Sequence, residues 1–220
     1  TKKEESTQDI AVSITAITAD QLAADQIYDI SDLAEVVPGF ETAKGVGSGS
    51  GFVLRGIGSY GVGAAVVSSI VTSINGHSTN PSWFVETGLL DIERIEVLQG
   101  PQGTKFGRNS VQGVINLVTK RPTDEFEGYV NVEAGSYDRK LVTGAINMPF
   151  SDSVRGRLAF GSNTRKGMVE NVATGNLMDD RNDASVRLSL DWDINDTTEL
   201  RFTYSGQKED DNRPQEETSY

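Results

Sequence analysis

The sequence predicts two structural parts, a small mixed α/β domain up to about residue 122 and a series of antiparallel β-strands after it. Two observations favour this division. Before Pro122, helix-capping and turn signals alternate with short apolar runs. After Pro122, apolar and polar residues alternate with the period of two that a β-strand imposes on its side chains.

The composition excludes several functional classes. Of the 220 residues, 20 are Lys or Arg and 32 are Asp or Glu, so the formal net charge is −12, which argues against nucleic acid as a partner because phosphate binding needs a basic surface. There is no Cys, which excludes disulfide frameworks and Cys-based zinc sites. With one His and no GxSxG, HExxH or phosphate-loop motif, we expect no enzyme, no catalytic residue, no metal and no cofactor.

Hydropathy detects neither a signal peptide nor a transmembrane helix in this sequence. The polar residues 1–5 lead into no apolar signal-peptide core, and no segment has the ~20 apolar residues of a transmembrane helix. A membrane β-barrel stays possible, because its strands give only a weak alternating signal. The polar segment 208–220 stops like an interrupted loop, so we expect the chain to belong to a longer polypeptide.

Sequence signals predict two helices in the first half. Thr18, followed three residues later by Gln21, forms a capping box for a helix that reaches about Gln26. A second helix begins near Asp29, because the apolar residues at 30, 33, 34 and 37 share one face, and it ends at Pro38.

The remaining elements of this half are short. We expect strands at 52–54, 66–74 and 113–119, a helical turn and strand over 91–98, and a flexible loop over 44–51. Asn75-Gly76 predicts a type I′ hairpin turn.

Five strands with one apolar and one polar face are predicted in the second half. They cover 126–134, 141–148, 154–160, 186–192 and 200–204. The fourth is the clearest, because Val186, Leu188, Leu190 and Trp192 alternate with polar residues.

Two readings of these strands are open, a soluble sandwich with one wet face and a membrane barrel. The alternation alone fits the soluble reading at least as well. The strongly polar second face favours the barrel, and so do the connections, which are short at 149–153 and 193–197 but long at 163–183. Phe150 and Trp192 lie beside the short turns, where an aromatic girdle would lie.

The segment 91–122, DIERIEVLQGPQGTKFGRNSVQGVINLVTKRP, resembles the plug-domain hallmark of TonB-dependent outer-membrane receptors of the proteobacterial branch. That hallmark is an ERIEV strand, a GPQG…FGRN turn and a strand ending in VTKRP. Residues 52–58 resemble the strand-plus-RG element of the family. Residues 3–16 resemble its entry, and residues 36–39 resemble one of its helix ends. The resemblance extends over roughly residues 3–210.

This resemblance implies an α+β plug domain over 1–122, followed by antiparallel transmembrane β-barrel strands over 123–220. Receptors of this family are barrels of about 22 strands filled by a plug. About five strands cannot close such a barrel, since even small transmembrane barrels have about eight. We therefore expect the chain to be a fragment of one.

The family's function would be TonB-dependent active import of a scarce ligand, such as a siderophore, a carbohydrate or a cofactor, across the bacterial outer membrane. The partners implied are TonB, a small-molecule ligand and outer-membrane lipid. TonB grips an N-terminal box, which we expect upstream of Thr1, with 10–14 as the alternative. A signal-transducing receptor of the same family and a soluble β-rich binding protein are the alternative functions.

The resemblance also implies two sets of site residues, each weighed against plain loop packing or plug salt bridges. Ligand contacts at the outer apex of the plug are expected at Tyr60, His77, Asn80 and Trp83. Contacts between plug and barrel wall are expected at Arg55, Glu93, Arg94, Glu96 and Arg108. Gln99 stands where the family usually has a wall-contacting Arg, so we expect a weaker lock between plug and wall here.

Overall fold

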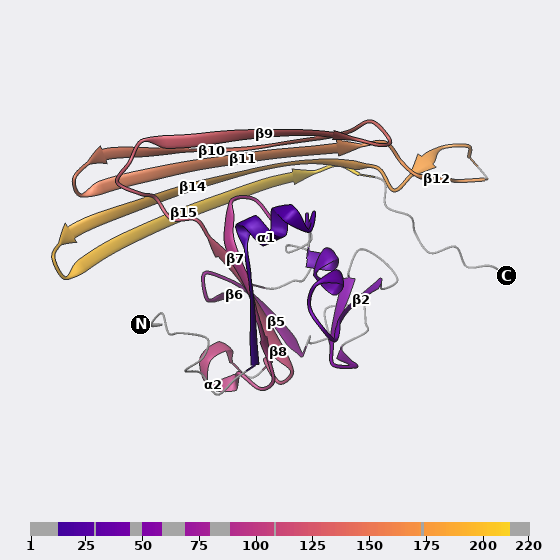
Figure 1. The fold of residues 1–220 in the computed structure, drawn as a ribbon, viewed down its shortest axis with the longest axis horizontal. Helices are drawn as coiled ribbons and strands as arrows, with labels where there is room; N and C mark the ends of the chain where they lie inside the picture. The colour runs from indigo at the N-terminus through magenta and orange to yellow at the C-terminus, as the bar shows by residue number, and fades with distance from the viewer. Residues whose placement is uncertain are drawn as a thin grey trace. The chain divides into compact units, whose positions relative to one another are not determined.

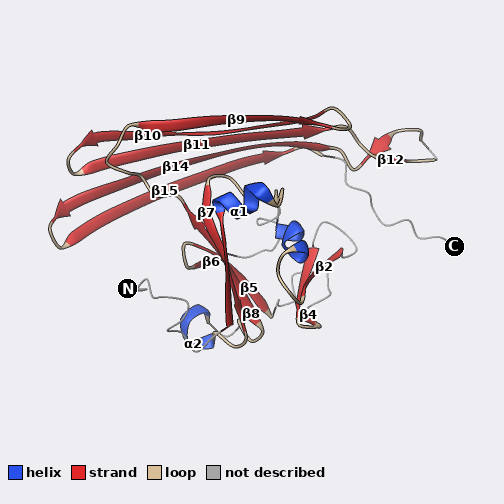
Figure 2. Cartoon of the chain, in the orientation of Figure 1, coloured by secondary structure: helices blue, strands red, loops and turns tan. Residues whose placement is uncertain are grey.

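A computed structural model of the chain describes residues 13–28, 30–44, 50–58, 69–79, 89–107, 109–172 and 174–211 (Figures 1 and 2). The chain divides into two compact units, 1–119 and 120–220. Among the described helices, none has the length and apolar character needed to cross a membrane.

A five-stranded sheet forms the centre of the first unit, with strand order β1-β7-β8-β5-β6. Its strands are β1 (Ser13–Thr18), β5 (Ile70–Ile74), β6 (His77–Thr79), β7 (Ile92–Gln99) and β8 (Gly113–Thr119). β8 lies in the middle, antiparallel to β7 and parallel to β5. The expected strands over 113–119 and at the end of 66–74 are confirmed, whereas 91–98 forms strand without a helix.

The middle strand β8 is a nearly continuous apolar run, and six of its seven residues are buried. Ile95, Val97, Val114 and Ile115 are at most 1% exposed. Ile95, Val97 and Ile115 belong to one apolar core with residues from the helices and from the smaller sheet, including Leu33, Phe40 and Phe52. The Phe40 and Phe52 rings stack at a centroid distance of 5.6 Å.

The first predicted helix is confirmed as α1 (Ala19–Ala24). The Thr18 hydroxyl accepts a hydrogen bond from the Gln21 N–H at 3.4 Å, and the Gln21 side chain accepts one from the Thr18 N–H at 3.0 Å. Both halves of the capping box are therefore formed. The helix is shorter than expected, because the backbone of Gln26 turns to a φ of 54°.

The second predicted α-helix is wrong in type, because residues Ile30–Glu35 form the 3₁₀ helix η1. A 3₁₀ helix aligns side chains three residues apart, and Ile30 and Leu33 are both fully buried while Ala34 is exposed. The side chains that η1 contributes to the core are therefore three residues apart, which is the spacing of a 3₁₀ helix. Pro38 lies three residues after Glu35 and disfavours a helical conformation at Val37.

A three-stranded antiparallel sheet completes the first unit, with β2 (Phe40–Lys44), β3 (Ser50–Leu54) and β4 (Ile57–Gly58). The short helix α2 (Gly103–Phe106), which the sequence analysis did not predict, precedes β8. The predicted hairpin turn is confirmed, since Asn75 and Gly76 have φ values of 51° and 77°, as a type I′ turn requires.

The second unit is built on one antiparallel sheet with strand order β15-β14-β11-β10-β9. Its strands are β9 (Glu127–Gly135), β10 (Arg139–Ser151), β11 (Val154–Arg165), β14 (Arg181–Asn195) and β15 (Thr198–Glu209). All five predicted strands are present, and four of them are longer than the alternation indicated.

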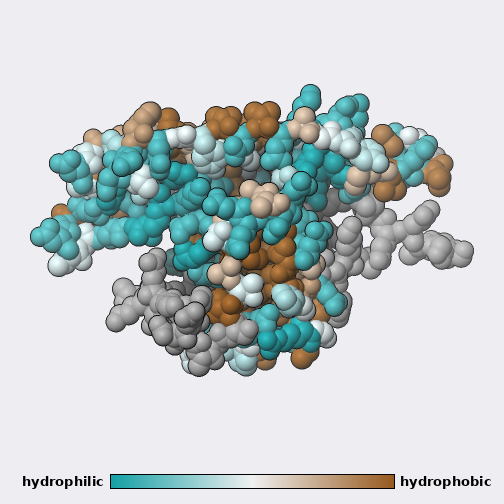
Figure 3. Space-filling view, in the orientation of Figure 1, coloured by the Kyte–Doolittle hydropathy of each residue, from teal (hydrophilic) through white to brown (hydrophobic). Residues whose placement is uncertain are grey.

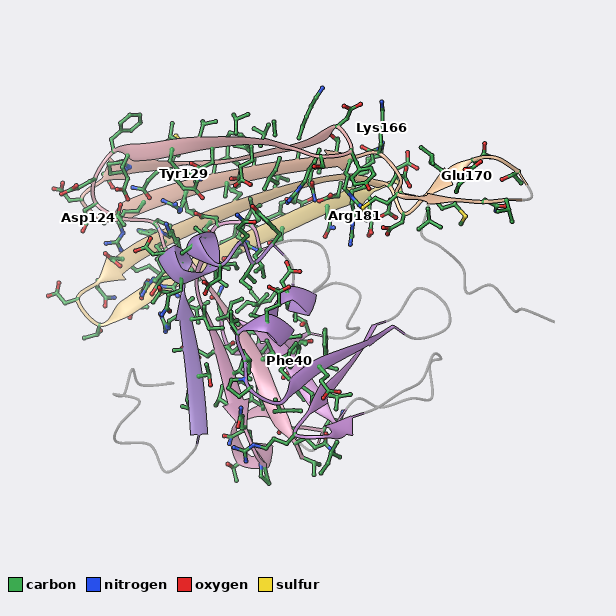
Figure 4. The ribbon with its side chains drawn as sticks, turned by 45° about the vertical axis from the view of Figure 1, so that its right-hand side comes forward. Phe40, Asp124, Tyr129, Lys166, Glu170 and Arg181 are labelled. Atoms are coloured by element: carbon green, nitrogen blue, oxygen red, sulfur yellow. The ribbon has the colours of Figure 1, made fainter. Side chains whose placement is uncertain are left out.

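The connections of this sheet differ at its two ends. Two-residue turns join β10 to β11 and β14 to β15 at one end. At the other end β11 continues into a long connection that carries the small hairpin of β12 (Val169–Glu170) and β13 (Leu177–Met178). Figure 4 shows Asp124 near the short-turn end, and Lys166 and Arg181 near the long-connection end.

The two faces of the sheet have opposite polarity. Direct register partners lie on the same face, and Leu158, Leu188 and Tyr204 are paired across three strands. Their face carries large apolar side chains that are exposed, including Val132 at 72%, Leu188 at 41% and Phe202 at 56%. In Figure 3, hydrophobic side chains, coloured brown, lie along the upper side of this sheet. The opposite face carries Asn, Asp, Arg and Ser.

Replacing Gly113 with Ala is expected to destabilise the centre of the first unit. A Cβ at Gly113 would lie 2.5 Å from the Leu98 carbonyl oxygen and 2.7 Å from a Leu54 methyl carbon, so the β7 backbone must shift. Overpacking of this kind costs about 1–3 kcal/mol. Amide hydrogen exchange of β8 in the intact protein measures the change as faster exchange.

The matched control for this prediction is Gly103→Ala, since a Cβ at Gly103 meets no atom within 4 Å. Exchange in β8 should stay unchanged in the control. Equal exchange rates in Gly113→Ala and the unmodified protein would contradict the packing described for β7 and β8.

Candidate functional site: a hydrogen-bonded domain and a polar sheet face

Three charged residues predicted as site residues come together on β7. The Arg94 guanidinium donates to Glu96 at 2.9 Å and to Glu93 at 2.5 Å. Partial burial acts to lower the pKa of Arg94, but the hydrogen bond and charge of Glu96, together with those of Glu93, outweigh it and raise that pKa. The cluster is therefore an ion-paired network.

The network continues into the sheet through Asn116 of β8, which is 6% exposed. Its side-chain amide donates to Glu96 at 2.8 Å. Its carbonyl oxygen accepts from the Ser73 hydroxyl at 2.8 Å and from the Gly76 N–H at 2.9 Å. One buried side chain therefore joins β7, β8, β5 and the hairpin turn, and it satisfies the polar groups that this crossing buries.

The hairpin turn that precedes His77 is fastened to the last residues of β8. The Asn75 N–H donates to the Leu117 carbonyl at 2.8 Å, and the Asn75 side chain exchanges hydrogen bonds of 3.0 Å with Thr119. The imidazole of His77 is exposed at the start of β6. The structure thus places His77 at the end of the sheet where β8 ends.

The other predicted residues are placed as follows. Arg55 is exposed in the turn between β3 and β4, has a φ of 55°, and its N–H donates to the Gly39 carbonyl at 2.6 Å. Gln99 is 9% exposed, and its amide lies 3.5 Å from the Pro38 carbonyl. Tyr60, Asn80, Trp83 and Arg108 lie outside the described residues.

Charges of both signs are paired across the polar face of the second unit. Arg201 of β15 donates to both carboxylate oxygens of Asp191, at 2.8 and 3.2 Å. Arg155 of β11 donates to Asp193 at 2.6 Å. Toward the long-connection end, Arg165 donates to the Asp179 carboxylate at 3.1 Å. These pairs make a face suited to contact with water or with a polar body.

Among the residues that the structure describes, no group of three or more His, Asp or Glu side chains is arranged to hold a metal ion. The described residues form a small domain whose strands are joined by polar networks, and a sheet whose apolar face is exposed.

Sequence reasoning missed Asn116, Ser73, Asn147 and Asp191 as organising residues. A signal for Asn116 was available, because it is the one amide side chain inside the otherwise apolar run GVINLVT. No local signal marks Asp191, because its partners are distant in sequence.

Comparison with known proteins agrees with this architecture. Residues 6–114 match the family described as the TonB-dependent receptor plug domain. The iron-regulated outer membrane virulence protein of Vibrio cholerae is 29% identical over 157 residues, which are 67% of this chain and 24% of that protein. The pesticin receptor of Yersinia enterocolitica is 29% identical over 175 residues, 74% of this chain and 24% of the receptor.

Solved structures share the fold of both units. The ferric yersiniabactin uptake receptor FyuA from Yersinia pestis superposes with a TM-score of 0.80 at 24% identity, covering 89% of this chain and 31% of that chain. The siderophore receptor PiuA from Acinetobacter baumannii gives 0.77 at 19% identity, covering 91% and 27%. The chain spans about a quarter of the curated relatives named above. Residues 6–114 belong to the TonB-dependent receptor plug domain family, and both units share their fold with these solved receptors.

Proposed function

We propose that the protein of which this chain forms part imports a ferric siderophore actively across the bacterial outer membrane, with the first unit as the gate. The observation that carries the proposal is the combination of a plug domain with a sheet whose apolar face is exposed. The choice of ligand class is supported by the relatives, whose names refer to iron regulation, ferric pyoverdine and ferric yersiniabactin.

In this proposal, the plug covers residues 1–122 and the barrel strands cover 123–220, in contact with lipid through their apolar face. The far edges of β9 and β15 carry no paired strand among the described residues. Backbone groups at such edges need hydrogen-bond partners inside a bilayer, so further strands of the receptor would close the barrel.

The gate would open through its hydrogen bonds. Its strands β1 and β7 are held by one ladder, and polar networks such as that of Asn116 tie the remaining strands together. A domain of this kind can stand in a water-filled lumen, and hydrogen bonds to water can replace its contacts when it is remodelled. TonB would supply the force through a box upstream of Thr1, or at 10–14.

The ligand would bind on the outer side of the plug, with Tyr60, His77, Asn80 and Trp83 as candidate contacts. Arg55, Glu93, Arg94, Glu96 and Arg108 are the candidates for contact with the barrel wall. The exposed imidazole of His77 and the ion-paired state of Arg94 are compatible with these roles.

A panel of ⁵⁵Fe-labelled siderophores tests the proposed function directly. Cells that lack the full-length receptor are compared with complemented cells under iron limitation, with and without collapse of the proton-motive force. Import restored only in energised, complemented cells is expected for at least one siderophore of the panel. Import that is independent of the proton-motive force would overturn energised transport, and the absence of restored import for every siderophore of the panel would overturn the ligand class.

Replacing Leu188 with Arg is expected to destabilise the full-length receptor in a bilayer. Leu188 lies on the exposed apolar face of β14. If it lies near the bilayer midplane, an arginine there costs about 2–4 kcal/mol, and less near an interface. Folding into lipid vesicles measured across a denaturant series gives the change.

Thr203→Arg is the matched control, because Thr203 pairs with Ser189 on the polar face of the same sheet. It should change stability much less than Leu188→Arg. Equal effects of the two variants would contradict the assignment of the apolar face to lipid.

Locking β1 onto β7 is expected to stop import without stopping binding. Thr15 and Val97 are direct register partners, and antiparallel partners have the separation that a disulfide needs. The double variant Thr15→Cys/Val97→Cys should bind siderophore in its oxidised form but lose import, and reducing agent should restore import.

The reduced form of the same double variant is the control for the substitutions themselves. The chain has no Cys of its own that could compete within these residues. Undiminished import with the disulfide verified by mass spectrometry would show that the gate does not open through β1.

A further inference from the structure

The segment 121–125, between the last strand of the first unit and β9, has no regular secondary structure but is fixed by side chains across the polar face of the sheet. Two residues earlier, Thr119 ends β8, so this segment is the covalent connection between the gate domain and the strands. Its contacts reach four different strands.

Asn147 of β10 fixes the middle of the segment. This side chain is fully buried, accepts from the Thr123 N–H at 2.9 Å, and donates to the Thr123 carbonyl at 2.8 Å and to the Glu125 carbonyl at 2.5 Å. One amide therefore pairs with three backbone groups, as a neighbouring strand would.

Arg121 fixes the start of the segment on β14 and β15. Its guanidinium donates to the buried Asp191 carboxylate at 2.9 Å and also pairs with Glu199. Asp191 is held in turn by Arg201. The Arg121 contact is therefore made to a carboxylate that is already positioned.

Asp124 adds a third contact, to β11. The Arg155 guanidinium donates to Asp124 at 3.1 Å and to Asp193 of β14 at 2.6 Å. These contacts are all made near the end of the sheet with the short turns, and each comes from a different strand or strand pair.

We propose that residues 121–125 form an anchor segment, which holds the C-terminal end of the gate domain on the barrel strands while the rest of that domain is displaced. The proposal rests on the proposed function of energised import. A pull applied at the N-terminus passes through β1, β7 and β8 before it reaches this segment, because that is the order of strands in the sheet. The anchor would confine displacement to the gate and leave its C-terminal end in place for refolding.

Single-molecule pulling on the N-terminus of the full-length receptor in a bilayer tests the anchor. After the gate domain has unfolded, release of residues 120–126 adds a further contour length of about 24 Å, at about 3.4 Å per residue. We expect this to be the last step before the strands, at a higher force than the gate's steps, and the gate to refold when the force is relaxed.

Two variants remove the two main contacts separately, Asn147→Ala and Arg121→Gln. Each should lower the force of the last step and the fraction of molecules whose gate refolds. Asn147→Ala should also accelerate amide exchange at Thr123 about tenfold, through the lost hydrogen bond. If one variant fails to fold, the other still tests the proposal.

Asn163→Ala is the matched control, because Asn163 of β11 lies on the same polar face of the sheet as Asn147 but toward the opposite end. Its side-chain oxygen accepts no hydrogen bond from the described residues. It should behave like the unmodified receptor. Release of 120–126 before the gate, or an unchanged last step in both anchor variants, would overturn the anchor.

Pulling requires neither TonB nor a ligand, so its result is independent of whether import is energised. If import is independent of the proton-motive force but the last unfolding step still needs a high force, the proposed function is overturned and the anchor is supported. Energised import with unaltered pulling in both variants would overturn the anchor alone.

Discussion

In the five-stranded sheet of the second unit, β15-β14-β11-β10-β9, the apolar face is exposed and the other face is polar. This polarity is the constraint on which the rest of the structure depends. Exposed Leu, Val, Phe and Trp side chains occupy one face, while ion pairs such as Arg201–Asp191 occupy the other. In water, such an apolar face would favour association. In the proposed function this face contacts lipid, and the opposite face lines a polar interior.

In the proposed function the first unit fills a polar interior and acts as its gate. The first unit has a compact apolar core around Ile95 and Ile115, but the connections between its strands run through Asn116 and through the Asn75–Thr119 pair. Such hydrogen bonds are specific while formed and can be exchanged for bonds to water when broken. A gate that must be both closed and displaceable benefits from this balance.

Much of the fold could be predicted because its signals are local. The capping box at Thr18, the Asn75-Gly76 turn and the period-two strands each depend on a few neighbouring residues. The 3₁₀ helix at 30–35 could not be predicted, because the buried positions of Ile30 and Leu33 depend on the core. The pairs of Asp191 with Arg121 and of Asn147 with Thr123 join residues distant in sequence, so only the sheet topology reveals them.

Oxygen accessibility along β14 tests the central claim most directly. Nitroxide labels placed singly at each position from 186 to 192 of the full-length receptor in a bilayer report contact with oxygen, which concentrates in lipid, or with a water-soluble nickel complex. The account predicts high oxygen contact at Val186, Leu188, Leu190 and Trp192, and low contact at the three residues between them. A profile without this alternation, or with nickel contact highest on the apolar face, would contradict it.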